Sequence, residues 1–354
     1  MTPSVTLKRS IDATLFPTAD FWHMAPHSPH TRPGFKEWSH FSVLGADFDL
    51  LMNFSLMAGG QGAKTRMTPR LTLLFGTADG SWDGDVESFS LADTTIFEGQ
   101  PDATLGRNSA RFANCRYCVE AAPSTRDIFV ALDLHPMTRP VIANNVRLSD
   151  AESVRWMVVP HLRAVGEVSI AGCRYQVADA PAYHDRNWGQ FAWGGAYAWE
   201  WATILPPGVD QPWCLVYSRI GNRYRGATLS QSLILWRREF PSRKFYGRDL
   251  SITHQGMLRR DRVLRLPRVA SLLIPGKAAD VPREIIVTAH GYGDEVALRM
   301  SFDDFAQVVV PNDRWPGFTT LCEIKGRAEV AGRVGDERVA FEGRVQAELN
   351  HAAG

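Results

Sequence analysis

Short segments of alternating apolar and polar residues, separated by turn signals, make up most of this sequence, and no long segment has the periodicity of an amphipathic helix. Alternation with a period of two residues is typical of β-strands that bury one face. Short apolar runs bounded by glycine, turn or breaker residues also read as strands, at 70–76, 154–160 and 284–289, and 127–134 mixes such a run with alternation. We therefore predict an all-β fold of sandwiches or barrels, with a single short helix at 301–307.

The length of 354 residues favours two domains over one. Two Gly-rich hairpin patterns, in 166–183 and 329–349, would each complete one half of the chain and suggest an internal duplication. Four prolines in the first 35 residues are typical of an extended segment. The predicted units are an extended N-terminal arm at 1–35, a first domain at 36–190 and a second domain at 191–354.

Composition excludes several classes of protein. The 39 Lys and Arg nearly balance the 38 Asp and Glu, so no net field attracts nucleic acid. No apolar run reaches the length of a transmembrane helix or matches a signal peptide, so we expect a cytoplasmic protein. Five cysteines do not make a disulfide framework, and no glycine-rich nucleotide motif is present, so we expect no cofactor.

The densest cluster of polar and aromatic residues is the heptapeptide Tyr-His-Asp-Arg-Asn-Trp-Gly at 183–189. On a strand, Tyr183 and Asp185 share one face and His184 lies on the other. We expect Asn187 to Gly189 to form a bulge or turn. If Asp185 faces an apolar cavity, burial raises its pKa and makes it a proton donor near neutral pH. The alternative is a structural hydrogen-bond network between the two domains.

A row of alternating aromatic residues follows this cluster in the sequence. Tyr197, Trp199 and Trp201 share one strand face, and Glu200 lies on the other. The chain holds 11 Trp, 18 Phe and 8 Tyr, which fill either a packed core or the walls of a cavity for a large apolar ligand. Both interpretations remain open for these rings.

Two further groups of side chains could carry chemistry. Glu37 and His40 flank Trp38 and Ser39 at the start of the first strand, where either could supply a second acid or base. Three histidines near the N-terminus have the residue type of a metal site, but they lie among prolines with no common face, so we expect no metal there. They are His23, His27 and His30.

The heptapeptide resembles the Y-H-D-H-N-W-G signature of the lipocalin-like AttH family, which is related to carotenoid 1,2-hydratase (hydroxyneurosporene synthase). Glu37-Trp38 is similar to the family's E-W-W-Y start, and Gly172 with Tyr175 matches the hairpin before the signature. The resemblance spans roughly 35–350. The chain departs from the pattern at Arg186, where His is usual, and at two positions of the first strand. Those positions are Ser39 and His40, where Trp and Tyr are usual.

This resemblance implies two tandem lipocalin-like β-barrel domains. It also implies chemistry on large apolar molecules without a redox cofactor, because relatives include hydratases of isoprenoid double bonds and cyclases of polyenes, some of them catalysing Diels–Alder reactions. The departures lie beside the expected cavity, so neither substrate nor mechanism carries over.

We therefore expect a lyase or cyclase of secondary metabolism acting on an isoprenoid or polyketide at the domain junction. The expected catalytic residues are Asp185, His184 and Tyr183. The expected substrate-binding residues are Trp188, Asn187, Arg186, Trp199, Trp201, Tyr197, Trp38, Glu37 and His40. In a proton-initiated reaction Asp185, or His184 through it, protonates a double bond. In a pericyclic reaction the cavity only positions the substrate, and Tyr183 or Arg186 polarises a carbonyl. Alternatives are a non-catalytic carrier of an apolar ligand and a metal-dependent hydrolase using the three histidines.

Overall fold

The computed structural model describes residues 15–353 except 29, 31, 60–65, 78, 79, 207, 209, 210, 225 and 274–279. The prediction of an all-β fold is confirmed, because strands make up most of these residues. The two α-helices of this part of the chain, α1 (Leu15–Ala19) and α2 (Ala270–Leu273), have five and four residues. Within the described ranges, no helix is long and apolar enough to cross a membrane.

The first sheet takes in the N-terminal half of the chain. Its order in the described residues is β4-β3-β2-β1-β12-β11-β9-β8-β7-β6-β5, with β10 paired to β11. The strands are β1 (Phe35–Leu44), β2 (Phe48–Gly59), β3 (Arg66–Thr77), β4 (Trp82–Ser88), β5 (Thr94–Ile96), β6 (Ala103–Leu105), β7 (Asn108–Ala113), β8 (Arg116–Ala121), β9 (Ile128–Pro136), β10 (Val141–Arg147), β11 (Ser153–Ile170) and β12 (Cys173–Gln190).

The second sheet takes in the C-terminal half. Its order in the described residues is β16-β15-β14-β13-β22-β21-β20-β19-β17, with β18 paired in parallel to β20. The strands are β13 (Tyr197–Leu205), β14 (Trp213–Asn222), β15 (Thr228–Arg237), β16 (Phe240–Tyr246), β17 (Leu250–Met257), β18 (Arg265–Leu266), β19 (Pro282–Gly291), β20 (Asp294–Pro311), β21 (Phe318–Val334) and β22 (Glu337–Ala353).

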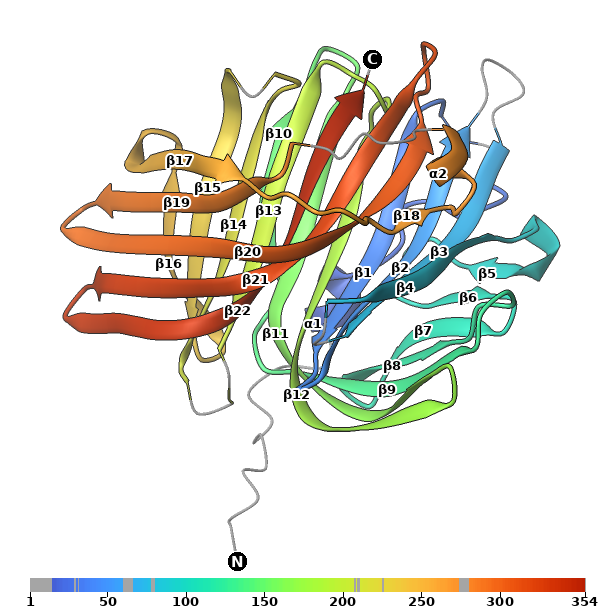
Figure 1. Ribbon diagram of the computed structural model, residues 1–354, viewed down its shortest axis with the longest axis horizontal. Coiled ribbons are helices and arrows are strands. Elements are labelled where there is room, and N and C mark those ends of the chain that lie inside the picture. Colours follow the sequence, from blue (N-terminus) through green and yellow to red (C-terminus); the bar gives the residue numbers. More distant parts are fainter. Residues whose placement is uncertain are drawn as a thin grey trace, which may run out of the picture.

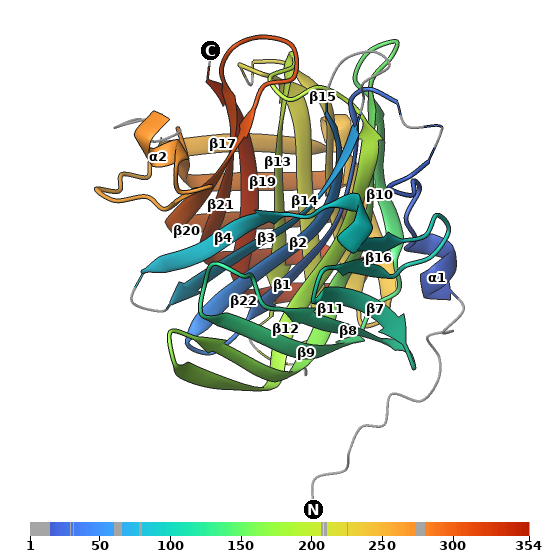
Figure 2. The same cartoon turned by 90° about the vertical axis from the view of Figure 1, so that its right-hand side faces the viewer.

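The two sheets repeat one topology. Each begins with a four-strand antiparallel meander, and the last strand of each sheet pairs with its first, β12 with β1 and β22 with β13. The strand before the last, β11 or β21, completes a long hairpin. Figure 1 shows the two curled sheets side by side, and Figure 2 shows the first sheet toward the viewer. This arrangement is that of a tandem lipocalin-like fold, as predicted.

The predicted helix at 301–307 is wrong, because β20 runs through this segment without interruption. A β-bulge between Phe302 and Asp304 shifts the register against β21. The bulge places an extra residue in the strand and breaks the two-residue alternation. Phe302, Phe305 and Ala306 are therefore all buried, at a spacing that imitates one face of a helix.

The described part of the predicted N-terminal arm is packed against the first sheet. Helix α1 begins this segment, and Phe16 and Trp22 are both buried in the core of the first sheet. Asp20, between them, is also buried. The guanidinium of Arg186 lies over the ring of Trp22, 4.5 Å from its centroid. The prolines led to the prediction of an extended arm, whereas the buried aromatic side chains hold the described part of this segment against the first sheet.

Each sheet has its own apolar core, and two further clusters join the sheets. One joining cluster includes Trp156, Tyr183 and Trp201, and the other includes Trp38 and Trp193. Both contain residues from the two sheets. The junction between the halves is therefore built largely from tryptophan and aliphatic side chains.

Candidate functional site in the cavity between the sheets

The heptapeptide at 183–189 lies entirely in β12, so the predicted bulge or turn at Asn187 to Gly189 is wrong. Its residues pair with β1 without a register shift, Asn187 with Trp38 and Gly189 with Lys36. A Cβ atom at Gly189 would lie 2.1 Å from the carbonyl oxygen of Ser153 on β11. The glycine permits a close approach of β11 within a regular strand, and it does not mark a turn.

The strand divides the heptapeptide between two environments, as the period of two predicted. Tyr183 belongs to the cluster that joins the sheets, whereas Trp188 belongs to the core of the first sheet. Asp185 and Asn187 share the face of Tyr183, which we call the outer face. His184 and Arg186 share the opposite face with Trp188, toward the core of the first sheet. We call it the inner face.

The inner face carries a network centred on Asp20. His184 Nε2 and the hydroxyl of Tyr117 each donate to the Asp20 carboxylate over 2.8 Å, and Arg186 donates to it through Nε. His184 Nδ1 donates to the carbonyl of His40 over 2.8 Å. Both ring nitrogens of His184 therefore face oxygen acceptors. Burial alone would raise the pKa of Asp20, but the charges of Arg186 and His184 hold it well below its usual range.

Glu37 and Trp188 extend this inner network. Glu37 accepts hydrogen bonds from the backbone and ring of His23, and the ring of His23 stacks on Trp188 with 4.0 Å between centroids. Burial raises the pKa of Glu37. No group of three metal-ligating side chains with suitable geometry occurs among the residues described. Four predicted site residues therefore lie on the inner face and do not line the cavity described next. They are Glu37, His184, Arg186 and Trp188.

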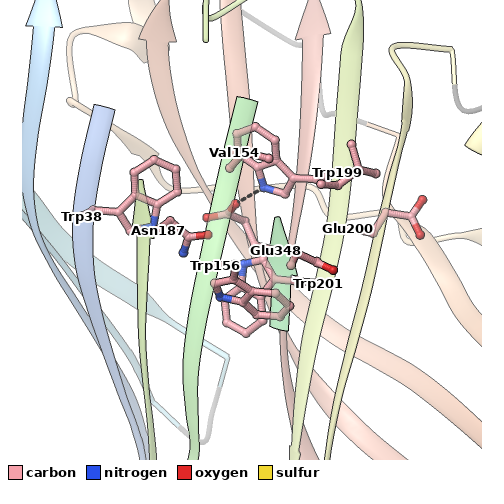
Figure 3. Close-up of a pocket in the computed structure, with 10 residues that line it drawn as sticks. Trp38, Val154, Trp156, Asn187, Trp199, Glu200, Trp201 and Glu348 are labelled. Atoms are coloured by element: carbon pink, nitrogen blue, oxygen red, sulfur yellow. Dashed lines mark hydrogen bonds between the residues drawn. The ribbon is translucent and has the colours of Figure 1, made fainter. Parts of the chain in front are cut away.

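The outer face opens onto a cavity between the two sheets (Figure 3). It contains about 450 Å³ of empty space, including space at its open mouth. Four of its ten lining residues are tryptophans, two from each sheet. Its lining residues are Trp38, Asn144, Val154, Trp156, Asn187, Trp199, Glu200, Trp201, Ile220 and Glu348. Apolar walls with a few polar groups are typical of small-molecule sites.

Asp185 lies directly behind this lining. Its side chain is 1% exposed, and its two oxygens accept hydrogen bonds from the Tyr183 hydroxyl over 2.7 Å and from Asn187 Nδ2 over 2.8 Å. Neither donor carries a charge. Burial raises the pKa of Asp185 to about 7, against an ordinary value of 3.8. Asp185 is thus a carboxyl group with a strongly raised pKa that does not itself line the cavity, although its hydrogen-bond partner Asn187 does.

Three other predicted site residues support the wall or lie beyond it. The ring of Tyr183 stacks on Trp201 with 5.3 Å between centroids, and His40 packs edge-on against the same indole. His40 Nε2 lies 2.8 Å from Ser42 Oγ, and burial lowers the pKa of His40 to about 3, so its ring is neutral. The hydroxyl of Tyr197 donates to the carbonyl of Ala192, outside the lining.

The sequence therefore predicted four of the residues that line the cavity, but it missed residues from more distant strands. The four are Trp38, Asn187, Trp199 and Trp201. Trp156 lies in the segment predicted as strand 154–160, two residues after Val154, which also lines the cavity. Glu348 lies near the end of the chain on β22. A single Glu in an alternating strand is normally taken as exposed, so only the fold reveals its burial.

Glu200 lies at the rim, with its carboxylate turned away from the tryptophans (Figure 3). It accepts hydrogen bonds from the Tyr217 hydroxyl over 2.9 Å and from His254 Nε2 over 3.0 Å. The partners of Glu200 lie on the side of β13 opposite the tryptophans. The prediction that Glu200 occupies the other strand face from Tyr197, Trp199 and Trp201 is therefore confirmed.

A search of family models and a search of curated proteins each found no match. Solved structures do match. An AttH protein from Nitrosomonas europaea superposes with a TM-score of 0.64 at 14% identity, over 92% of this chain and 98% of that one. The chain has an AttH-like fold. Kievitone hydratase from Nectria haematococca superposes with a TM-score of 0.58 at 11% identity, covering 95% and 94% of the two chains. CghA, solved with Sch210972, superposes with a TM-score of 0.60 at 12% identity, covering 96% of each chain.

Proposed function

We propose that this protein is a cofactor-independent lyase or cyclase that hydrates or cyclises a double bond of a large apolar molecule, an isoprenoid or polyketide. The observation that carries the proposal is a tryptophan-walled cavity backed by Asp185, a carboxyl group with a pKa near 7 and no charged partner among its hydrogen-bond donors. The similarity of fold to kievitone hydratase, which by its name adds water to kievitone, supports the same class of reaction.

In the proposed reaction, Asp185 donates its proton to a carbon of the double bond. Asn187 releases its hydrogen bond to Asp185 when the substrate enters, which opens the carboxyl group to the cavity. The faces of Trp38, Trp156 and Trp199 stabilise the resulting cation by about 2 kcal/mol each where water is excluded. Water, or a second double bond of the same molecule, then captures the cation.

His184 and Arg186 have a different role in this proposal. Both side chains are held by Asp20 on the inner face. They fix the strand that carries Asp185 and do not contact the substrate. The departure of Arg186 from the AttH signature therefore changes a buried ion pair and leaves the cavity wall as it is.

The experiment that tests the function is an incubation of purified protein with metabolite extracts, compared by mass spectrometry with heat-treated protein. A compound that gains the mass of one water indicates hydration, and one that changes retention at constant mass indicates cyclisation. Asp185→Asn should lose turnover by about 10²–10⁴-fold. Asp179→Asn is the matched control, because Asp179 is exposed on the same strand.

Two results would contradict the proposal. An apolar compound that remains bound without conversion would identify a carrier. Full turnover by Asp185→Asn would show that catalysis needs no proton from this residue, as in a pericyclic reaction.

A further inference from the structure

Two glutamates face each other across the last hairpin of the second sheet. Glu323 on β21 is paired in register with Glu348 on β22. Their exposed fractions are 2% and 4%. Two carboxyl groups that are buried side by side cannot both be ionised at low cost, because burial removes most of the solvent screening of their repulsion.

The same hairpin contains an exposed version of this pair. Glu329 and Glu342 are also cross-strand partners, but both lie on the solvent face. Such a pair keeps both charges in water at little cost. The comparison shows that burial, and not the pairing of two glutamates, makes the first pair unusual.

The hydrogen bonds around the buried pair distinguish its two members. Glu323 hydrogen-bonds Glu348, and the indole Nε1 of Trp199 donates to Glu348 Oε1. Burial and the neighbouring charge of Glu348 raise the pKa of Glu323 well above its ordinary value. Burial also raises the pKa of Glu348, but the donors around it favour its ionised form. Glu323 therefore keeps the proton that the two groups share.

Only Glu348 of this pair lines the cavity. In Figure 3 its carboxylate lies among the side chains of Trp38, Asn187 and Trp199, with the hydrogen bond from Trp199 shown as a dashed line. The site thus has carboxyl groups on two sides, Glu348 from the second sheet and Asp185 behind the wall of the first. They are close enough for their charges to interact.

We propose that Glu348 is the general base of this site and accepts the proton that is released when the reaction ends. The inference rests on the proposed function. In a hydration, Asp185 gives one proton to carbon, water forms the new C–O bond, and the second proton of that water passes to Glu348. In a cyclisation, Glu348 takes the proton from the carbon next to the cation as the final double bond forms.

The proton count closes in both cases. After turnover Asp185 has lost one proton and Glu348 has gained one, so transfer from Glu348 to Asp185 through solvent restores the starting state. Glu323 touches no substrate and acts as a positioning residue. Its protonated carboxyl group holds the Glu348 carboxylate in the cavity.

The test compares Glu348→Gln with Glu342→Gln, its matched control on the same strand, using the substrate found in the extract incubation. We expect kcat to fall at least about 100-fold for Glu348→Gln and to stay unchanged for Glu342→Gln. Quenching of tryptophan fluorescence by N-phenyl-1-naphthylamine shows that each variant is folded and that its cavity still binds an apolar molecule.

A spectroscopic measurement tests the shared proton without turnover. Infrared spectra at pH 8 should show a protonated-carboxyl band in the wild type and in Asp185→Asn that disappears in the double variant Glu323→Gln/Glu348→Gln. The absence of this band from the wild type would overturn the assignment of Glu348.

The outcomes separate the two proposals. A wild type that converts substrate, with Glu348→Gln equally active, would overturn the role of Glu348 and leave the proposed function intact. A wild type that converts nothing would overturn both proposals.

Discussion

The carboxyl groups on the two faces of β12, Asp20 inside and Asp185 outside, are both almost fully buried but lie in electrostatically opposite surroundings. On the inner face, Asp20 binds Arg186 and His184, and these positive charges lower its pKa. On the outer face, Asp185 has only neutral donors, and burial raises its pKa to about 7. Consecutive residues of one signature therefore serve two purposes. The inner set pairs buried charges, and the outer set leaves a buried carboxyl group whose pKa lies near 7.

Removing the anion from the inner face should produce the largest effect. Asp20→Asn removes the hydrogen-bonded counter-charge of the buried Arg186 and leaves it, among the described residues, only Glu37, whose carboxylate lies 3.9 Å from the guanidinium. We therefore expect the free energy of unfolding to fall by about 3–5 kcal/mol. Urea denaturation followed by circular dichroism measures this loss. Asp150→Asn, which removes an exposed carboxylate paired with Arg147, is the control and should have no measurable effect. A stable Asp20→Asn variant would show that the inner network is dispensable.

The pH dependence of the free energy of unfolding should reveal the raised pKa of Asp185 on the outer face. The pKa of Asp185 is raised in the folded state, so between about pH 4 and about pH 7 the unfolded chain releases a proton that the folded protein keeps. Wild-type stability therefore falls as the pH rises through this window. Asp185→Asn should lose this contribution, on the order of 4 kcal/mol, and gain stability relative to the wild type at pH 8. Parallel curves for the two proteins in urea titrations would contradict the raised pKa.

A smaller effect should follow from weakening one donor to Glu348. Trp199→Phe keeps an aromatic wall but removes the indole N–H that Glu348 accepts. We expect turnover to fall about tenfold, since a hydrogen bond to a charged group contributes about 1.5 kcal/mol or more. Trp236→Phe is the control, because the buried Trp236 Nε1 has no acceptor in the described part of the chain. Equal kcat values for the two variants would show that this hydrogen bond has no catalytic role.

The sequence was informative wherever alternation alone decides the structure. It predicted the strands, the all-β class and the opposed faces of Asp185 and His184. It failed where a local irregularity or a distant partner decides. The bulge at Phe302 imitated a helical spacing, and Asn187 to Gly189 imitated a turn because strand β11 requires a glycine there.

The site itself was only half predictable for the same reason. Trp38, Trp199 and Trp201 belong to conspicuous aromatic segments, whereas Glu348 becomes a cavity residue only because β22 pairs with β13. Asp20 was hidden in a proline-rich segment with no strand pattern. No local pattern could show that it neutralises Arg186, since 166 residues separate the two in the chain.

This separation has a consequence for how the protein is made. Asp20 leaves the ribosome 166 residues before Arg186 does. Until β12 has been synthesised, the N-terminal segment has no cationic partner on that strand, and Phe16 and Trp22 lack the finished sheet that buries them. The ion pair between Asp20 and Arg186 can therefore form only after the contacts of Phe16 with Phe112 and Tyr117 have become possible.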